Sequence, residues 1–327
     1  MIITRTPFRI SFAGGGSDLA SYYQHEPGVV LSTAINKYMY IAVKEHFEQN
    51  FRISYSRTEI VDTVAQIEHP IVRECLNMVG LSQGLEVVSM GDLPARTGLG
   101  SSSSFTVGLL HALYAMQGRM VSREQLAKDA CSIEIEKLRE PIGKQDQYIA
   151  AYGGMQFIQF NPDGGVFVDP VILAPEARRE FQKRLLIFFT GHTRDARDVL
   201  ARQNASTGEK IPVLRRMCEI AREMREVLTS GPDINVFGAL LHEAWEAKRS
   251  LTEGISNQRI DDWYARARSA GALGGKLLGA GGGGFLLFFC EAHNQQRVRE
   301  ELSELRELTF SLHPEGSKIV HVGSERD

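Results

Sequence analysis

A glycine–serine loop at residues 98–104, GLGSSSS, carries residue types suited to binding an anion. Glycine lets several backbone N–H groups turn toward one point. A helix that begins at the serines would add its unpaired amides and the positive end of its dipole. A serine-rich helix cap is the simpler alternative, but four consecutive serines exceed what capping needs. The sequence therefore predicts a phosphate site made by Gly98, Leu99, Gly100, Ser101, Ser102, Ser103 and Ser104.

Two familiar nucleotide motifs are absent from the chain. A Walker A loop needs Gly-Lys followed by Ser or Thr, and neither Gly143-Lys144 nor Gly275-Lys276 meets this requirement. The stretch GAGGGG at 279–284 formally matches the dinucleotide pattern GxGxxG, but FLLFF follows it and predicts a strand where that motif needs a helix. We expect this loop to allow a close approach of two backbone segments or of a ligand.

Candidate catalytic or metal-binding carboxylates lie in residues 133–154, IEIEKLREPIGKQDQYIAAYGG. Glu134 and Glu136 stand two apart on a predicted helix, so they face different directions and at most one can join a site. Asp146 is predicted to lie in a loop beside cationic and amide side chains, where a carboxylate can accept a proton or orient a hydroxyl nucleophile. A solvated loop with incidental charges is the alternative for this segment.

The elements that position these residues alternate in type along the first half of the chain. Helical spacing predicts helices at 101–117 and 122–138, and a mostly helical region over 194–270. The composition shifts near 175–185, so we expect two domains, 1–180 and 181–327, in an α+β architecture. Runs of β-branched and aromatic residues predict strands at 2–12, 28–46, 51–55, 85–90, 155–160, 165–172, 185–190 and 285–290.

Composition and charge exclude several classes of protein. The 327 residues are 43% hydrophobic and 24% charged, with a net charge of −3, so no basic excess favours nucleic acid. The longest strongly apolar run, 285–290, is far shorter than a membrane span, and the first residues do not resemble a signal peptide. Four separate cysteines form no CxxC pair. We therefore expect a reduced, cytoplasmic protein.

Three segments together resemble the motifs of the GHMP kinases, the family of galactokinase, homoserine kinase, mevalonate kinase and phosphomevalonate kinase. They are TPFRISFAGGGSDL at 6–19, PARTGLGSSSSFTVG at 94–108 and KLLGAGGGGFLLFF at 276–289. Their order and spacing across nearly the whole chain make the resemblance specific. It implies an N-terminal domain like domain 2 of ribosomal protein S5, a ferredoxin-like C-terminal domain and an active site between them.

Within that family, the likeness is strongest to the sugar kinases that act on D-glycero-D-manno-heptose 7-phosphate. The shared features are AGGGSD at 13–18, GKQDQYIAAYGG at 143–154 and FTGHTRDARDVL at 189–200. The resemblance implies transfer of the ATP γ-phosphoryl group to the anomeric hydroxyl, giving the 1,7-bisphosphate for nucleotide-activated heptose. Two alternatives stay open: another sugar 1-kinase of the family, such as a fucose-type enzyme, or a non-catalytic module that senses sugar or ATP.

The resemblance also implies roles for individual residues. Asp146 matches the catalytic aspartate, and Arg9 stands where galactokinases have an arginine that stabilises negative charge. Ser102 is the expected hydroxyl ligand of Mg²⁺, and Glu134, twelve residues before Asp146, is preferred over Glu136 as its carboxylate ligand. Mevalonate-kinase-like members place a lysine near position 9, so the arginine here favours the sugar branch.

Substrate contacts are expected from both glycine loops and from a second anion site. Asp18 matches an aspartate that binds sugar hydroxyls, although it could equally cap the helix after the triple glycine. Arg194 and Arg197 could bind the phosphate that the acceptor already carries, with a solvated basic face as the alternative. The full set of expected substrate contacts is Gly15, Gly16, Ser17, Asp18, Lys144, Arg194, Arg197, Gly281 and Gly282.

The expected partners are small molecules, ATP with Mg²⁺ and a sugar phosphate. Nucleic acid and membrane are not expected, and a homodimer stays open. Trp245 lies on a predicted helix and is expected to pack in the core.

Overall fold

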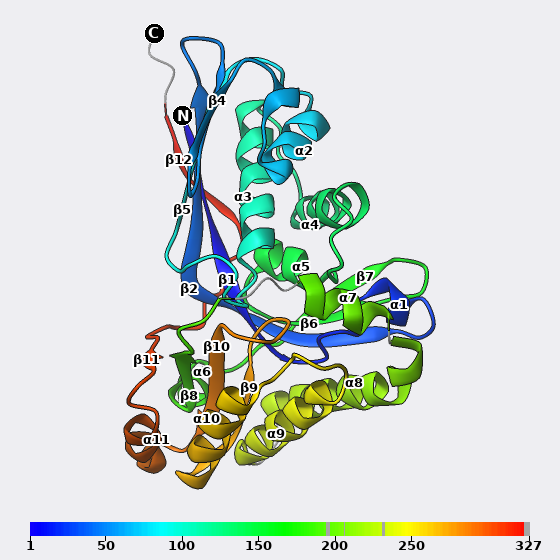
Figure 1. Ribbon diagram of the computed structural model, residues 1–327, viewed down its shortest axis with the longest axis vertical. Coiled ribbons are helices and arrows are strands. Elements are labelled where there is room, and N and C mark those ends of the chain that lie inside the picture. Colours follow the sequence, from blue (N-terminus) through cyan, green and yellow to red (C-terminus); the bar gives the residue numbers. More distant parts are fainter. Residues whose placement is uncertain (194–196, 206, 231–232, 324–327) are drawn as a thin grey trace.

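Two β-sheets with helices packed against them organise the chain (Figure 1). The computed structural model describes residues 1–193, 197–205, 207–230 and 233–323. One sheet has eight strands and the other has four. Strands and helices occur throughout both halves, which confirms the α+β class.

The larger sheet is centred on its two longest strands, β1 (Ile2–Ala13) and β2 (Gly28–Glu45). The first part of β2 pairs with β6, and its later part pairs with β5. The last strand, β12, returns from the C-terminal end of the chain to pair with β1 (Figure 1). The other strands of this sheet are β3 (Phe51–Ser54), β4 (Thr58–Val61), β5 (Leu85–Gly91), β6 (Met155–Phe160), β7 (Val166–Pro170) and β12 (Lys318–Val322).

The smaller sheet has the antiparallel order β11-β8-β10-β9. Its strands are β8 (Leu185–Phe189), β9 (Ala272–Leu277), β10 (Phe285–Cys290) and β11 (Arg306–Glu307). Every residue of β10 is buried, as its continuous apolar run FLLFFC requires.

Helices cover one side of the larger sheet, where α2, α3, α4 and α5 lie together (Figure 1). The helices predicted over 101–117 and 122–138 are confirmed, although the second continues as a π-helix at Ser132–Lys137. Helix α2, helix α5 and strand β4 were not predicted. The helices are α1 (Ala20–Tyr23), α2 (Pro70–Val79), α3 (Ser101–Met116), α4 (Arg123–Cys131), α5 (Gln145–Tyr152), α6 (Pro175–Lys183), α7 (Arg197–Ala205), α8 (Thr207–Ser230), α9 (Asn235–Arg249), α10 (Gln258–Ser269) and α11 (Gln295–Glu301).

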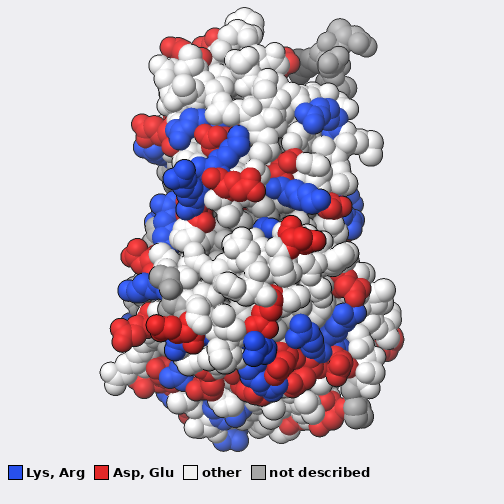
Figure 2. All heavy atoms as spheres, turned by 90° about the vertical axis from the view of Figure 1, so that its right-hand side faces the viewer, with Lys and Arg blue, Asp and Glu red and all other residues white. Residues whose placement is uncertain are grey.

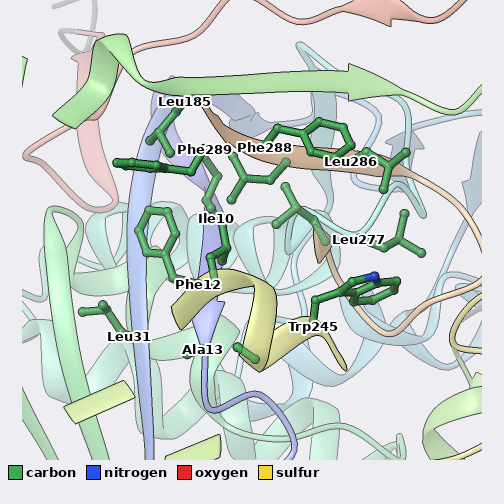
Figure 3. Packing of buried hydrophobic residues seen from close by; sticks show 14 of the residues in the cluster. Ile10, Phe12, Ala13, Leu31, Leu185, Trp245, Leu277, Leu286, Phe288 and Phe289 are labelled. Atoms are coloured by element: carbon green, nitrogen blue, oxygen red, sulfur yellow. The ribbon is translucent and has the colours of Figure 1, made fainter. Parts of the chain in front are cut away.

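Strand β1 joins the two sheets through a shared core. Phe8, Ile10 and Phe12 alternate along β1 and belong to the same buried cluster as α9 and β10. The ring of Phe12 lies 5.3 Å from that of Phe237 in an edge-to-face contact. Trp245 is fully buried in this cluster, which confirms its predicted packing role (Figure 3). Because the cluster draws on both sides of residue 180, the domain boundary there stays a prediction.

Charged side chains of both signs are interspersed on the molecular surface. The face in Figure 2 shows Lys and Arg alternating with Asp and Glu, without a continuous basic field. None of the helices in the described ranges has the length and apolar character needed to cross a bilayer.

Candidate active site

A cavity of about 710 Å³ opens where the three glycine segments meet. This volume falls within the range of small-molecule sites. The predicted residues that line it are Arg9, Gly15, Gly16, Asp18, Gly98, Gly100, Ser101, Ser102, Ser103, Asp146, Arg197 and Gly281. Segments separated by more than 250 residues in the sequence therefore form one site.

Gly98 and Gly279 bring the second and third glycine loops into direct backbone contact. A Cβ atom on Gly98 would lie 2.4 Å from the carbonyl oxygen of Leu278, and one on Gly279 would lie 2.4 Å from the Cα of Gly98. Both residues also have positive φ angles, +82° and +77°. Only glycine fits at this contact, which confirms that the GAGGGG loop serves a close backbone approach.

Helix α3 begins at the cavity wall. Gly100, in the left-handed conformation, precedes the helix, and the amides of Ser101, Ser102 and Ser103 occupy its first turn, where a helix has no internal acceptors for them. The hydroxyl of Ser104 instead donates to the carbonyls of Pro7 at 2.8 Å and Gly100 at 3.0 Å. The side chains of Ser104 and Leu99 are buried outside the cavity wall, so the part of these two residues in the phosphate site stays a prediction.

Arg9 and Asp146 form a bidentate ion pair beside this helix start. Nε and Nη2 of Arg9 donate to Oδ1 and Oδ2 of Asp146, both at 2.7 Å, and Nη1 donates to the carbonyl of Gly98 at 2.6 Å. Arg9 points into the cavity because it alternates along β1 with Phe8 and Ile10, which face the core. Asp146 lies in the first turn of α5, so the loop predicted for it is wrong. Gly143, just before Asp146, favours a loop in the sequence. In the structure the apolar residues that follow Asp146 pack helix α5 against α3 and β1.

Glu134 lies behind the serines of the helix start and is only 1% exposed. Its Oε1 accepts from the hydroxyl of Ser102 at 2.8 Å, while its Oε2 accepts from Ser103 and Gln147. Burial raises the pKa of Glu134, and these hydrogen bonds oppose the rise. Glu136 instead accepts from Ser132 on the outer face of the π-helix. The two carboxylates therefore face different directions, as their spacing predicted.

Asp18 fixes two neighbouring loops. Its Oδ1 accepts from the amide of Gly16 at 2.8 Å, and its Oδ2 accepts from the amide of Gln145 at 3.2 Å. Asp18 thus binds the first amide of α5 and does not cap α1, which begins after Leu19 without a side-chain cap. Burial raises the pKa of Asp18, and the nearby Asp146 adds to the rise. Its neighbour Ser17 is fully buried and donates to the carbonyls of Gly14 and Val29, so the predicted substrate contact of Ser17 is wrong.

The predicted second anion site is only partly assembled. Arg197 lines the cavity and forms an ion pair with Glu140. Arg194 lies outside the described residues. Two other predicted contacts lie outside the cavity wall and stay predictions. Lys144 donates to the carbonyl of Gly164 and lies over the Tyr23 ring, and the amide of Gly282 is bound to the carbonyl of Ile255.

Several residues on the cavity wall were not predicted from the sequence. Tyr55, His69 and Phe105 form an aromatic group on the cavity wall, with the His69 and Phe105 rings stacked 5.0 Å apart. Lys248 and Lys276 line the cavity from α9 and β9. The position of Lys276 at the start of the third motif was a usable signal. The others are scattered along the chain and carry no common pattern.

Comparison with known families identifies the chain. The model described as "GHMP kinases N terminal domain" matches residues 70–154, and "GHMP kinases C terminal" matches residues 224–307. Together they cover more than half of the chain. The chain belongs to the GHMP kinase family. This GHMP kinase is accordingly a phosphoryl-transferring enzyme, and ATP is the phosphate donor in its family.

Individual relatives match over nearly the full length of this GHMP kinase. D-glycero-alpha-D-manno-heptose 7-phosphate kinase of Campylobacter jejuni is 29% identical, over 95% of this chain and 96% of that protein. The bifunctional fucokinase/GDP-fucose pyrophosphorylase of Arabidopsis thaliana is 27% identical over 94% of this chain and 32% of its own length. The crystal structure of a D-glycero-D-manno-heptose 1-phosphate kinase from Bacteroides thetaiotaomicron superimposes with a TM-score of 0.82 at 23% identity, covering 99% of this chain and 100% of that one, and so matches in fold.

Proposed function

We propose that this GHMP kinase transfers the γ-phosphoryl group of ATP to the anomeric hydroxyl of D-glycero-D-manno-heptose 7-phosphate. The product would be the 1,7-bisphosphate, a precursor for nucleotide-activated heptose. The main support is the Arg9–Asp146 pair at the cavity wall, next to the amides that begin α3. The full-length similarity to the Campylobacter heptose 7-phosphate kinase supports the choice of acceptor.

The residues present fit ATP. The helix start at Ser101–Ser103 offers backbone amides and a positive dipole end to the phosphates. The aromatic group of Tyr55, His69 and Phe105 on the cavity wall offers flat apolar surface for the base. Two cations on the cavity wall, Arg9 and Lys248, lie close enough to Asp146 to interact with it. We infer that the nucleotide lies along the cavity with its γ-phosphate toward Asp146.

The residues also fit Mg²⁺. Proteins usually hold Mg²⁺ through one or two carboxylates, with substrate phosphates and waters completing its shell. The Ser102 hydroxyl and Glu134 Oε1 lie 2.8 Å apart behind the phosphate loop, and both could contribute oxygen ligands. Among the described residues no group of three or more His, Cys, Asp or Glu side chains could hold a metal without the nucleotide. When bound, Mg²⁺ would neutralise part of the charge of the phosphate chain.

The protein side chains have distinct tasks in the proposed reaction. Asp146 orients the acceptor hydroxyl and receives its proton as the new bond to phosphorus forms. Arg9 holds both oxygens of this carboxylate and keeps N–H donors beyond the three bonds formed here. Those donors can stabilise negative charge on the group in transfer. Phosphoryl transfer depends mainly on such positioning and charge stabilisation.

A fucose-type sugar is the second candidate acceptor, because a fucokinase matches over 94% of this chain. The two candidates differ in whether the acceptor carries a phosphate. Arg197 already pairs with Glu140 at the cavity wall. A phosphorylated acceptor would compete for the guanidinium, whereas a neutral sugar would leave this pair intact.

A panel of sugars tests the proposal through ADP release with Mg²⁺ and ATP. We expect heptose 7-phosphate to give the highest kcat/KM, and Arg197→Ala to raise the KM of that acceptor but not that of a neutral sugar. Arg225→Ala is the matched control, since Arg225 forms a surface ion pair with Asp169. Faster turnover of an unphosphorylated sugar would contradict the choice of acceptor. Tight ATP binding without turnover of any sugar would instead favour a sensing module.

A further inference from the structure

Helix α9 carries a lysine whose side chain ends in the active-site cavity. Lys248 is only 6% exposed, and its Nζ donates to the carbonyl oxygen of Gly279. It lines the same cavity as Arg9, Asp18 and Asp146. Its charge is close enough to all three to influence them electrostatically. A cation from the C-terminal half of the chain thus reaches the proposed site of phosphoryl transfer.

A second buried lysine, Lys276, has a structural role and serves as a comparison for Lys248. Lys276 donates to the carbonyls of Ser11 at 2.7 Å and Phe12 at 3.1 Å, and so ties β9 to β1. Lys248 has one such acceptor within the described ranges and forms no ion pair with a described carboxylate. Since an ammonium has three donors, Lys248 keeps two of them for whatever occupies the cavity.

The surroundings of Lys248 disfavour the charged form of its buried ammonium unless a negative group approaches it. Burial and, to a smaller extent, the charge of Arg9 lower the pKa of Lys248 to about 8, although Asp18 and Asp146 oppose the change. The ammonium of Lys276, on β9, also faces it. A buried cation with so little compensation costs free energy, and an incoming anion would recover it.

Lys248 and Arg9 hold the two glycine loops at their point of contact. Arg9 binds the carbonyl of Gly98, and Lys248 binds the carbonyl of Gly279. These two glycines touch each other, so both cations bind carbonyls at the contact between the phosphate loop and the third glycine loop. A phosphoryl group passing from the start of α3 toward Asp146 would come close to both cations.

We propose that Lys248 is a further catalytic residue, whose ammonium donates to the oxygens of the phosphoryl group in transfer. The acceptor oxygen forms the new bond to the γ-phosphorus while the bond from phosphorus to the β–γ bridging oxygen breaks. ADP leaves with that electron pair, the hydroxyl proton passes to Asp146, and Lys248 keeps its protons. The proposal rests on the proposed function only in that a phosphoryl group crosses this cavity, and it holds for any acceptor.

The test compares Lys248→Met with Arg249→Met, measured on the acceptor that the wild type turns over fastest. Arg249 is the next residue of α9 and pairs with Glu246 and Asp261 away from the cavity. We expect Lys248→Met to lower kcat by about 10²–10³-fold, as the loss of one transition-state donor does. The KM for ATP should change by less than about threefold, because the loss falls on the transition state. Arg249→Met should retain kcat.

Two further readouts separate catalysis from a structural role. Lys248→Met should keep or raise the melting temperature, because an apolar chain replaces a buried cation. The alkaline limb that Lys248 gives to the wild-type profile of kcat/KM should disappear in this variant. The catalytic role of Lys248 would be overturned if Lys248→Met kept kcat within about fivefold of wild type, or if a fall in its melting temperature accounted for the lost activity. Neither result would bear on the proposed acceptor. A wild type that turns over only a different sugar refutes the proposed acceptor but not Lys248, whereas one inactive on every sugar refutes both.

Discussion

Replacing Asp146 by asparagine tests the centre of the proposed mechanism. The aspartate accepts two hydrogen bonds from Arg9, both at 2.7 Å, and its side chain is 23% exposed. Asparagine has nearly the same shape, but its amide group turns one of these acceptors into a donor and removes the negative charge. The variant therefore keeps the cavity while losing both the proton acceptor and half of the bidentate pair.

The size of each effect follows from this geometry. Leaving one N–H of a charged guanidinium without its acceptor costs about 1–3 kcal/mol of the free energy of unfolding. That cost should lower the melting temperature by several degrees without preventing folding. Loss of the proton acceptor should lower kcat by about 10²–10⁴-fold. The KM for ATP should change little, because the proposal places the nucleotide mainly at the start of α3.

The assay is ADP release at saturating Mg²⁺ and ATP, with the melting temperature measured on the same preparations. Asp169→Asn is the control, since Asp169 forms an exposed pair with Arg225 outside the cavity. Such a surface pair contributes about 0–1 kcal/mol, so this control should keep both its stability and its kcat. If Asp146→Asn retained kcat within about tenfold of wild type, the assignment of the proton acceptor would be refuted.

Three other perturbations test the remaining parts of the site. Ser102→Ala removes a proposed metal ligand and should raise the Mg²⁺ concentration that gives half-maximal rate. The control Ser132→Ala loses only a surface hydrogen bond to Glu136 and should leave this concentration unchanged. Equal Mg²⁺ dependence of the two variants would count against Ser102 as a ligand. Gly98→Ala should lower both the melting temperature and the affinity for ATP, because its Cβ atom would lie 2.4 Å from the carbonyl oxygen of Leu278. The control Gly118→Ala has no atom within 4 Å of its Cβ position. It should therefore lose only about 1–2 kcal/mol of the free energy of unfolding, because of its positive φ angle. Burial lowers the pKa of His69, so the stability from its neutral ring is lost as pH falls below 6.5. His69→Asn, which keeps a helix-capping acceptor, should therefore lose less melting temperature than wild type between pH 7.5 and 5.5; equal losses would refute this.

Much of the fold follows from local signals. Strands β1, β2 and β6 and helix α3 lie within one or two residues of their predicted ends, because β-branched runs and helical spacing are unambiguous there. Helix α5 was missed since Pro141 and Gly143 precede it. Its amide at Gln145 is bound by Asp18, 127 residues away, and no local pattern reports such a partner.

From the sequence alone came the predicted phosphate loop, the glycine contact and the candidate residues Arg9, Asp146 and Glu134. These depend on local backbone freedom, on the chemistry of each side chain and on motifs that keep their order along the chain. Which polar residues face the cavity depends on the packing of distant segments. This packing turned Ser17 and Ser104 toward backbone carbonyls, turned Lys144 outward and brought Lys248 inward from α9. The reason is physical: a buried polar group takes the acceptors that packing provides, and packing joins segments that are distant in sequence.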